Sequence, residues 1–142
     1  MKFFNTENEL QDYRESGDWA LVSEDTPLLA HLTILENIAL LREFHHGEKL
    51  PRAEEKARQL LIDCGYSHIA GQKPFERDHK ENFVARYIRA VASDFDKILV
   101  VSPFSQTKNA GIMNLLQNLA AFFPQKDVEI IDLKANKRYY EG

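Results

Sequence analysis

This sequence of 142 residues predicts an α/β fold that is interrupted by a run of helices. Two observations support this prediction. Short apolar runs at 19–22, 98–101 and 128–133 are typical of strands, and the unbroken run 98–101 is typical of a parallel strand covered on both faces. Between the first two of these runs, apolar residues recur at helical spacing in three successive segments.

A short polar helix is expected near the N-terminus, over residues 5–16. Asn5 or Thr6 serves as its N-cap, because a side-chain oxygen there accepts from the free N–H groups of the first turn. Gly17 ends it, and the strand at 19–22 follows.

The run of helices begins with a capping box. Thr33 and Glu36 have the spacing at which each side chain satisfies the other's end of the first turn. A helix over 34–44 follows and ends at Gly47, and Pro51 suits the first turn of the next helix. The two later helices carry apolar stripes, formed by Ala53, Ala57, Leu60, Leu61 and Cys64 and, after a loop over 66–78, by Phe83, Val84, Tyr87, Ile88 and Val91.

The last third of the chain returns to alternating strand and helix. An apolar helix over 110–123 stops at Pro124, and the strand 128–133 follows. A turn at Ala135-Asn136 is expected to bring 137–140 back as a strand that pairs with 128–133.

Composition excludes several classes of protein. With 18 Lys+Arg against 22 Asp+Glu the formal net charge is −4, which argues against a nucleic-acid partner. A single Cys precludes an internal disulfide and a cysteine-based zinc site, so no metal is expected. No apolar run reaches the ~18–20 residues of a membrane-spanning helix, and the N-terminus does not read as a signal peptide. We therefore expect a cytoplasmic protein with no direct membrane insertion.

One stretch resembles a known family. Thr33-Ile34-Leu35-Glu36-Asn37-Ile38-Ala39-Leu40 is similar to the LTVxENVxLPL stretch that opens the helical subdomain of ATP-binding-cassette (ABC) transporter ATPases, just after their Q-loop. Further segments resemble that family in the same order along the chain. Residues 19–25 resemble the strand that leads into the Q-loop, with Glu24 in place of Gln, and residues 57–65 resemble the LLxxVGL helix. Residues 85–99 resemble the helix after the signature together with the Walker B strand, and residues 131–142 resemble the family's C-terminal ending. The spacing over 31–76 most resembles the lipid-asymmetry and solvent-resistance branch.

The catalytic elements of that family are absent or altered. The phosphate cradle G-x-x-x-x-G-K-[ST] does not occur, and the chain starts just after the place where it would lie. The signature LSGGQ aligns with 77–81, which holds no glycine, and the Walker B strand runs into Ser102-Pro103 without a carboxylate. No His follows residue 79 to act as the switch histidine. Because phosphoryl transfer depends on positioned charge and metal, we expect no ATPase activity, no catalytic residue and no cofactor.

The resemblance implies a single domain over 1–142, a partial P-loop NTPase core without the Walker A strand-loop-helix. Residues 30–93 would form its helical subdomain, and 1–29 with 94–142 its partial α/β core. The missing elements would normally cover the strand 98–101 and the helix 110–123. Apolar surface should therefore be left exposed, and large exposed apolar patches mark interfaces.

These points predict a non-catalytic binding or regulatory subunit of a membrane transport complex. An ABC permease, a true ATPase subunit or a second copy would be its partner, and would hold it at the inner membrane. In the family the docking groove lies around the segment matching 24–44, which makes Glu24, Asp25, Leu28 and Ile34 the candidate partner-binding residues. Glu24 reads equally well as a solvated turn carboxylate.

Two alternatives stay open. The chain is also consistent with a split ATPase whose phosphate loop comes from another chain. It is equally consistent in fold with a stand-alone α/β interaction module, because fold alone does not determine function.

Overall fold

The computed structural model describes the chain apart from residues 48, 77 and 142 and the side chains of residues 41–46. The chain divides into two compact units. Unit 1 contains residues 1–26 and 95–142, and unit 2 contains residues 27–94.

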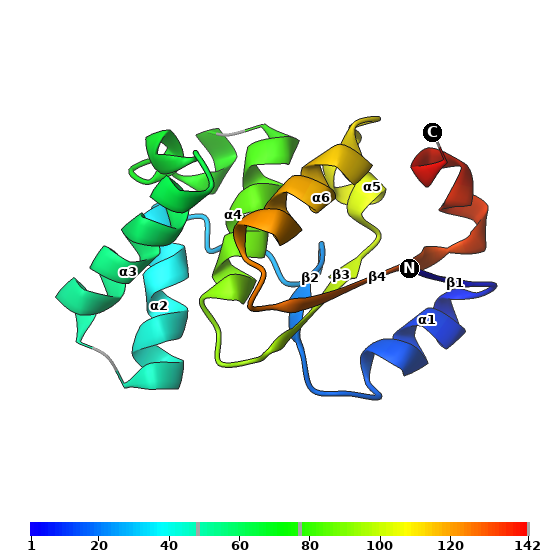
Figure 1. Ribbon diagram of the computed structural model, residues 1–142, viewed down its shortest axis with the longest axis horizontal. Helices are drawn as coiled ribbons and strands as arrows, with labels where there is room; N and C mark the ends of the chain where they lie inside the picture. Colours follow the sequence, from blue (N-terminus) through cyan, green and yellow to red (C-terminus); the bar gives the residue numbers. More distant parts are fainter. Residues whose placement is uncertain (48, 77, 142) are drawn as a thin grey trace. The chain divides into compact units, whose positions relative to one another are not determined.

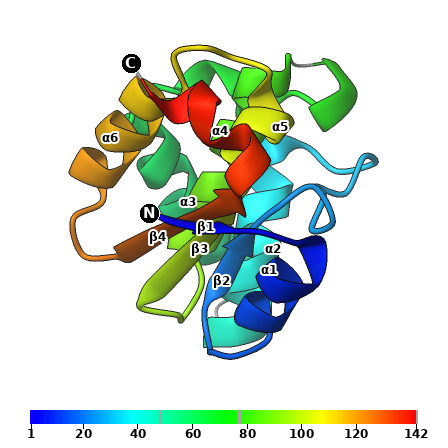
Figure 2. The ribbon, with the colours of Figure 1, turned by 90° about the vertical axis from the view of Figure 1, so that its right-hand side faces the viewer.

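Unit 1 is built on a parallel sheet of four strands in the order β1-β4-β3-β2 (Figures 1 and 2). The predicted α/β class and parallel sheet are therefore confirmed. β3 lies between β4 and β2, and Ile98, Leu99 and Val100 have no solvent exposure. The strands are β1 (Lys2–Phe4), β2 (Ala20–Val22), β3 (Lys97–Val101) and β4 (Asp127–Leu133).

The N-terminus differs from the sequence-based prediction. The strand β1 pairs with β4, and only Asn5 and Thr6 connect it to the helix α1 (Glu7–Arg14). The sequence predicted the helix, with Thr6 as its cap, but placed no strand before it, since a three-residue strand has no periodicity to detect. The strand β1 therefore precedes the predicted helix without having been expected.

The helix α1 covers one face of this sheet. Leu10 is buried against Leu99, Val101 and Ile131. The expectation that the strand 98–101 is left uncovered is therefore wrong, because the short helix at the N-terminus supplies the cover. Partly buried aromatic and aliphatic side chains extend this core, namely Phe4, Tyr13, Trp19, Leu21 and Leu133.

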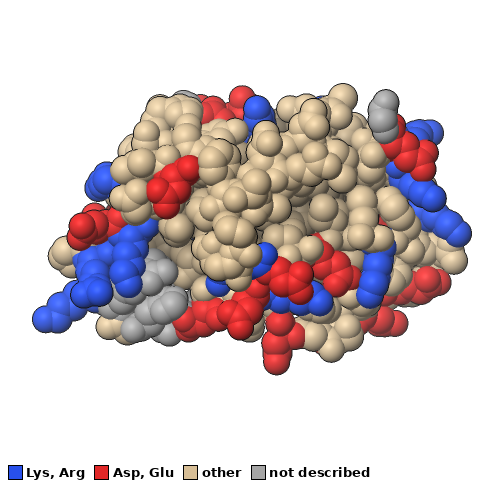
Figure 3. All heavy atoms as spheres, in the orientation of Figure 1, with Lys and Arg blue, Asp and Glu red and all other residues tan. Residues whose placement is uncertain are grey.

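The opposite face is covered by α6 (Ile112–Phe122) (Figures 1 and 2). This helix contains no charged residue, and its exposed side keeps Phe122 at 50% exposure. Figure 3 shows a broad area without charged side chains over it. Because the amides of Asn114, Gln117 and Asn118 are exposed beside Phe122, this side of the helix is uncharged, and Phe122 is its one large exposed apolar side chain among the described residues. The buried stripe of α6 consists of Ile112, Leu115, Leu116 and Leu119.

The segment after β4 is not a strand. Residues Lys134–Tyr140 form the 3₁₀ helix η3, so the predicted pairing of 137–140 with β4 is wrong. β4 is hydrogen-bonded to β1 on one side and to β3 on the other, so it has no free edge for a further strand. A short helix that the sequence did not predict, α5 (Pro103–Thr107), follows β3.

The Glu129 carboxylate on β4 interacts with three polar side chains beside this core. Tyr13 donates its hydroxyl hydrogen to Glu129, while Lys97 Nζ and Lys2 Nζ lie 3.2 Å and 3.4 Å from the Glu129 carboxylate oxygens. Partial burial alone would raise the pKa of the Glu129 carboxyl. The Tyr13 hydrogen bond and the two ammonium groups outweigh it and hold that pKa below its ordinary value.

This lowered pKa predicts a pH-dependent share of stability. The charged carboxylate is favoured in the folded state, so its contribution is present above the unfolded pKa and is lost as pH falls through the folded pKa. We expect Glu129→Gln to reduce the free energy of unfolding at pH 7 by about 1 kcal/mol or less, because the lysines are solvated. The gap between the two proteins in urea denaturation should close as pH falls below about 4.5. A gap that stays constant between pH 7 and pH 3 would contradict this account.

Unit 2 consists of three α-helices, α2 (Ile34–His46), α3 (Leu50–Asp63) and α4 (His79–Val91). The predicted capping box is confirmed, since Thr33 Oγ1 accepts from Glu36 N at 3.1 Å and Glu36 Oε1 accepts from Thr33 N at 3.0 Å. α2 packs against both α3 and α4. The predicted loop over 66–78 contains two 3₁₀ turns, η1 (Ser67–Ile69) and η2 (Pro74–Glu76). The apolar stripes are buried at Ala53, Ala57, Leu61, Cys64, Phe83, Val84, Tyr87, Ile88 and Val91.

Candidate functional site at the carboxyl edge of the sheet

The carboxyl ends of β2, β3 and β4 meet at one edge of the sheet, where open α/β proteins bind their ligands. A hollow of about 280 Å³ lies there, which we call the carboxyl-edge hollow. Its lining is rich in oxygen atoms and consists of Glu7, Ser23, Glu24, Asp25, Val101, Ser102, Ser105, Leu133 and Asn136.

The acidic turn after β2 supplies two carboxylates to this hollow. Arg14 Nη2 donates to Asp25 Oδ1 at 2.9 Å, and Ser23 Oγ donates to the same oxygen at 2.7 Å. These bonds, from Arg14 first and from Ser23 second, hold the pKa of the Asp25 carboxyl below its ordinary value. Asp25 is thus an ionised side chain that has partners although it is 62% exposed, and Glu24 is exposed as well.

The turn after β3 is held in an unusual backbone conformation. Ser102 has φ 49° and ψ 57°, the left-handed region that residues other than glycine rarely adopt. Its N–H donates to Ile131 O at 2.9 Å, and its hydroxyl donates to Asp132 Oδ1 at 3.0 Å. Gln106 of α5 fixes the neighbouring strand ends, because its Nε2 donates to Val22 O at 3.0 Å and to Val101 O at 2.8 Å.

Asp132 is the centre of this edge and has no solvent exposure. Besides the Ser102 hydroxyl, its carboxyl accepts from Leu133 N at 2.7 Å, from Asn136 Nδ2 at 2.9 Å and from the Tyr140 hydroxyl. The Tyr140 oxygen in turn accepts from Phe104 N at 3.1 Å. Burial, and secondly the Asp132 carboxyl, raise the pKa of Tyr140 far above its ordinary value, so this hydroxyl remains a donor. Asp132 thereby ties η3 to the ends of two strands.

The charges around the carboxyl-edge hollow oppose anions. Glu7, Glu24 and Asp25 bring three carboxylates to it, and none of its lining residues within the described part of the chain is Lys or Arg. A phosphate would meet like charge here, and a positively charged group would be attracted. Within the same part of the chain, no cluster of three or more His, Cys, Asp or Glu side chains is arranged to hold a metal ion.

The four predicted partner-binding residues divide between the two units. Glu24 and Asp25 belong to unit 1 and line the carboxyl-edge hollow. Leu28 and Ile34 belong to unit 2, where they are 8% and 0% exposed and serve its core. Binding of a partner by these four residues stays a prediction.

Some of the residues that shape these segments escaped the sequence analysis. Leu29 is 42% exposed, whereas its neighbour Leu28 is buried. Asn37 fixes the backbone of Leu29, since its Oδ1 accepts from Leu29 N at 2.7 Å and its Nδ2 donates to Leu29 O at 3.1 Å. The one sequence feature that could have indicated the role of Asp132 is its position as a carboxylate within the apolar run 130–133. No sequence feature indicated the role of Gln106.

The segment that aligns with the family signature serves its own helix. Asp78 is the N-cap of α4, and its Oδ1 accepts from Glu81 N at 2.7 Å. Glu81 also lies 3.2 Å from His68 Nε2. Residues 77 and 142, which took part in the resemblance, lie outside the described residues.

Comparison with solved structures gives the architecture a context. The dimeric bacterial ABC transporter cassette MJ0796 superposes with a TM-score of 0.65 at 20% identity, over 94% of this chain and 60% of that one. The chain shares its fold with ATP-binding cassettes. The post-hydrolysis state of MJ0796 bound to ADP and Pi gives 0.63 at 21% identity, over 91% of this chain and 57% of that one. The chain thus spans about 60% of the cassette's length. No protein-family model and no curated protein matches it.

No helix in the described part of the chain combines the length and the apolar character needed to span a membrane.

Proposed function

We propose that this chain is a non-catalytic ABC ATPase-like component of a membrane transport complex, in which it binds or regulates a partner. The observation that supports the proposal is an acidic hollow at the carboxyl edge of a cassette-like sheet, the edge at which such sheets bind ligands. In this proposal the chain is cytoplasmic and reaches the inner membrane only through its partner.

The start of α1 supports the non-catalytic part of the proposal. A phosphate-binding loop presents converging N–H groups and a Lys between a strand and a helix. Here two residues join β1 to α1, and the first residue of the helix is Glu7, a carboxylate that lines the carboxyl-edge hollow. Ser102 stands where the family's Walker B carboxylates would follow β3, so magnesium has no anionic ligand from that turn.

Nucleotide titration tests this part. We expect no change in the thermal unfolding midpoint of the purified chain on addition of ATP with Mg²⁺, or of ADP, up to millimolar concentration. A ligand at 100 times its Kd would stabilise the fold by about 2.7 kcal/mol, so the absence of a shift is informative. Saturable stabilisation together with phosphate release that a point change in this chain abolishes would overturn the proposal. Phosphate release only with a second chain present would favour the split ATPase.

The two exposed carboxylates of the acidic turn, Glu24 and Asp25, are the proposed contact with the partner. Glu24 is the better probe, because Asp25 already holds Arg14 and its loss would disturb the turn itself. Complementary charge across an interface accelerates and orients association, so the partner surface should be basic. Leu28 and Ile34 contribute from inside unit 2 by shaping the segment that follows.

Co-purification tests the partner. A complex with a permease or an ATPase subunit should form, and Glu24→Lys should weaken it about tenfold or more, more strongly at low salt. Glu55→Lys, the same change at an exposed position of α3, is the matched control and should leave the complex unchanged. A stable monomer that binds no transporter component would contradict the proposal and favour the stand-alone module.

A further inference from the structure

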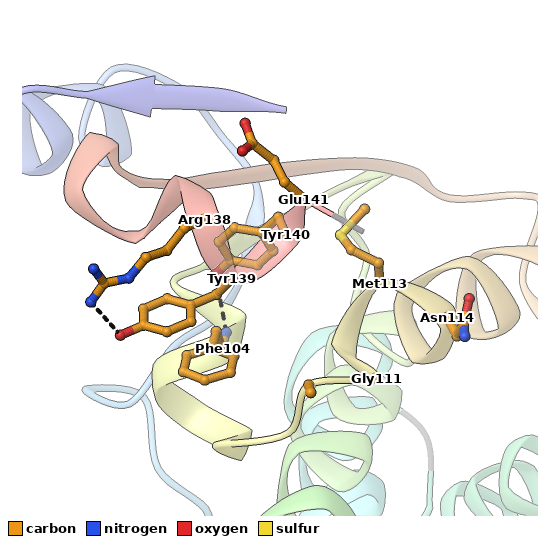
Figure 4. Close-up of a pocket in the computed structure, with 9 residues that line it drawn as sticks. Phe104, Gly111, Met113, Asn114, Arg138, Tyr139, Tyr140 and Glu141 are labelled. Carbon is orange, nitrogen blue, oxygen red and sulfur yellow. Dashed lines mark hydrogen bonds between the residues drawn. The ribbon is translucent and has the colours of Figure 1, made fainter.

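Unit 1 contains a second hollow, bordered by η3, α5 and the start of α6, with a volume of about 420 Å³. We call it the Tyr139 hollow. It shares no lining residue with the carboxyl-edge hollow. Figure 4 shows Tyr139 and Tyr140 on one side of it and Met113 on the other. Its lining also includes Phe104, Ala110, Gly111, Asn114, Arg138 and Glu141.

The aromatic wall of the Tyr139 hollow is rigidly held. The Phe104 and Tyr139 rings stack with centroids 3.9 Å apart and planes 2° apart. The Phe104 N–H donates to the Tyr140 hydroxyl, which Asp132 anchors from within the sheet. A wall fixed in this way need not be ordered by a ligand, which saves entropy on binding.

The remaining walls suit a flat, apolar ligand. Met113 offers a polarisable thioether, which makes favourable contacts with aromatic rings. The volume lies in the range of ~300–1,000 Å³ that small-molecule sites occupy, and such sites combine apolar walls with a few polar groups.

One cation, Arg138, borders the Tyr139 hollow beside Tyr139. Arg138 Nη2 donates to the Tyr139 hydroxyl at 3.0 Å, and the guanidinium carbon lies 5.0 Å from the Tyr139 ring centre. That bond uses one of five N–H donors, so others are left for a ligand anion. The lining carboxylate, Glu141, has Lys137 Nζ at 3.8 Å, which offsets its charge. The exposed amide of Asn114 adds further donors.

We propose that the Tyr139 hollow binds a flat aromatic anion, with its ring against Met113 and the aromatic wall and its anionic group on Arg138. This binding site is independent of the proposed function, because it uses neither the acidic turn nor the carboxyl-edge hollow.

The fluorescent dye 8-anilinonaphthalene-1-sulfonate, a flat aromatic anion, is a direct probe. We expect saturable binding to the full chain at one site. Arg138→Gln should weaken binding about tenfold, as the loss of a charge-assisted hydrogen bond implies. Met113→Glu should weaken it further by placing a carboxylate beside the ring. Arg52→Gln, the same change at an exposed position of α3, is the matched control and should bind the dye as the parent does.

Two further measurements make the result decisive. The thermal unfolding midpoint of each variant shows that it is folded, which the exposure of Arg138 favours. The neutral analogue N-phenyl-1-naphthylamine should bind more weakly than the sulfonate and should be insensitive to Arg138→Gln. Equal dye affinity in the parent, Arg138→Gln and Met113→Glu would place the dye elsewhere and overturn the proposal. Equal affinity for the neutral and charged probes would likewise overturn it.

Discussion

Asp132→Ala is expected to lower the free energy of unfolding by about 3–4 kcal/mol, the largest effect of a single substitution that we predict here. The side chain has no solvent exposure, and four donors converge on it, from Ser102, Leu133, Asn136 and Tyr140. Removal of the carboxyl leaves these partly buried donors without their acceptor, which costs more than the bonds themselves contribute. Urea denaturation followed by circular dichroism measures the loss.

Asp127→Ala provides the control for this substitution. Asp127 is the first residue of the same strand and is exposed, so its removal should change stability by no more than about 0.5 kcal/mol. Tyr140→Phe, which deletes one donor only, should fall between the two. If Asp132→Ala and Asp127→Ala proved equally mild, the buried carboxyl would not be what holds η3 against the sheet.

Asn37→Asp is expected to cost about 3 kcal/mol and to release the segment before α2. The Asn37 amide is 3% exposed, and its Nδ2 donates to Leu29 O at 3.1 Å and to Thr33 O at 3.0 Å. A carboxylate has no such donor, so its oxygen would face these carbonyl oxygens in a buried place. Hydrogen exchange at the Leu29 amide, together with urea denaturation, measures the effect.

The pH dependence identifies the cause of this loss. Burial near carbonyl oxygens raises the pKa of the introduced carboxyl, and its protonated form regains one donor. The destabilisation should therefore shrink as pH falls and reach its full size near neutrality. Asn118→Asp, at an exposed position of α6, is the control and should be nearly neutral. A loss that does not change with pH would argue against the hydrogen-bond explanation.

Local patterns were sufficient to predict much of unit 2. The capping box of Thr33 and Glu36, the helix end at Gly47 and the buried stripes of α3 and α4 are set by contacts within a few residues. Helical periodicity and caps act over one or two turns, so they can be read without knowledge of the rest of the chain. The strand at 98–101 could also be predicted from the sequence, because a strand that is buried on both faces requires a continuous run of apolar residues.

The candidate site was predicted only in part. The acidic turn at Glu24 and Asp25 was recognised from the sequence, and it lines a hollow. The partners that define its chemistry come from far along the chain: Asp25 pairs with Arg14, and Gln106 ties Val22 to Val101. Such pairs have no fixed spacing, so no local pattern reports them. Burial depends in the same way on distant segments, so the sequence did not reveal that Leu28 and Ile34, which were predicted as partner contacts, are core residues.

By itself, the sequence determined the class of the fold and the helices of unit 2, because apolar spacing and capping are properties of neighbouring residues. Only the tertiary structure decided the outcome at the two ends of the chain. β1 is a strand because β4 offers it an edge, and 137–140 is not one because both edges of β4 are then occupied. Competition for a strand edge is settled by the whole sheet, and three- or four-residue segments carry no signal strong enough to reveal it beforehand.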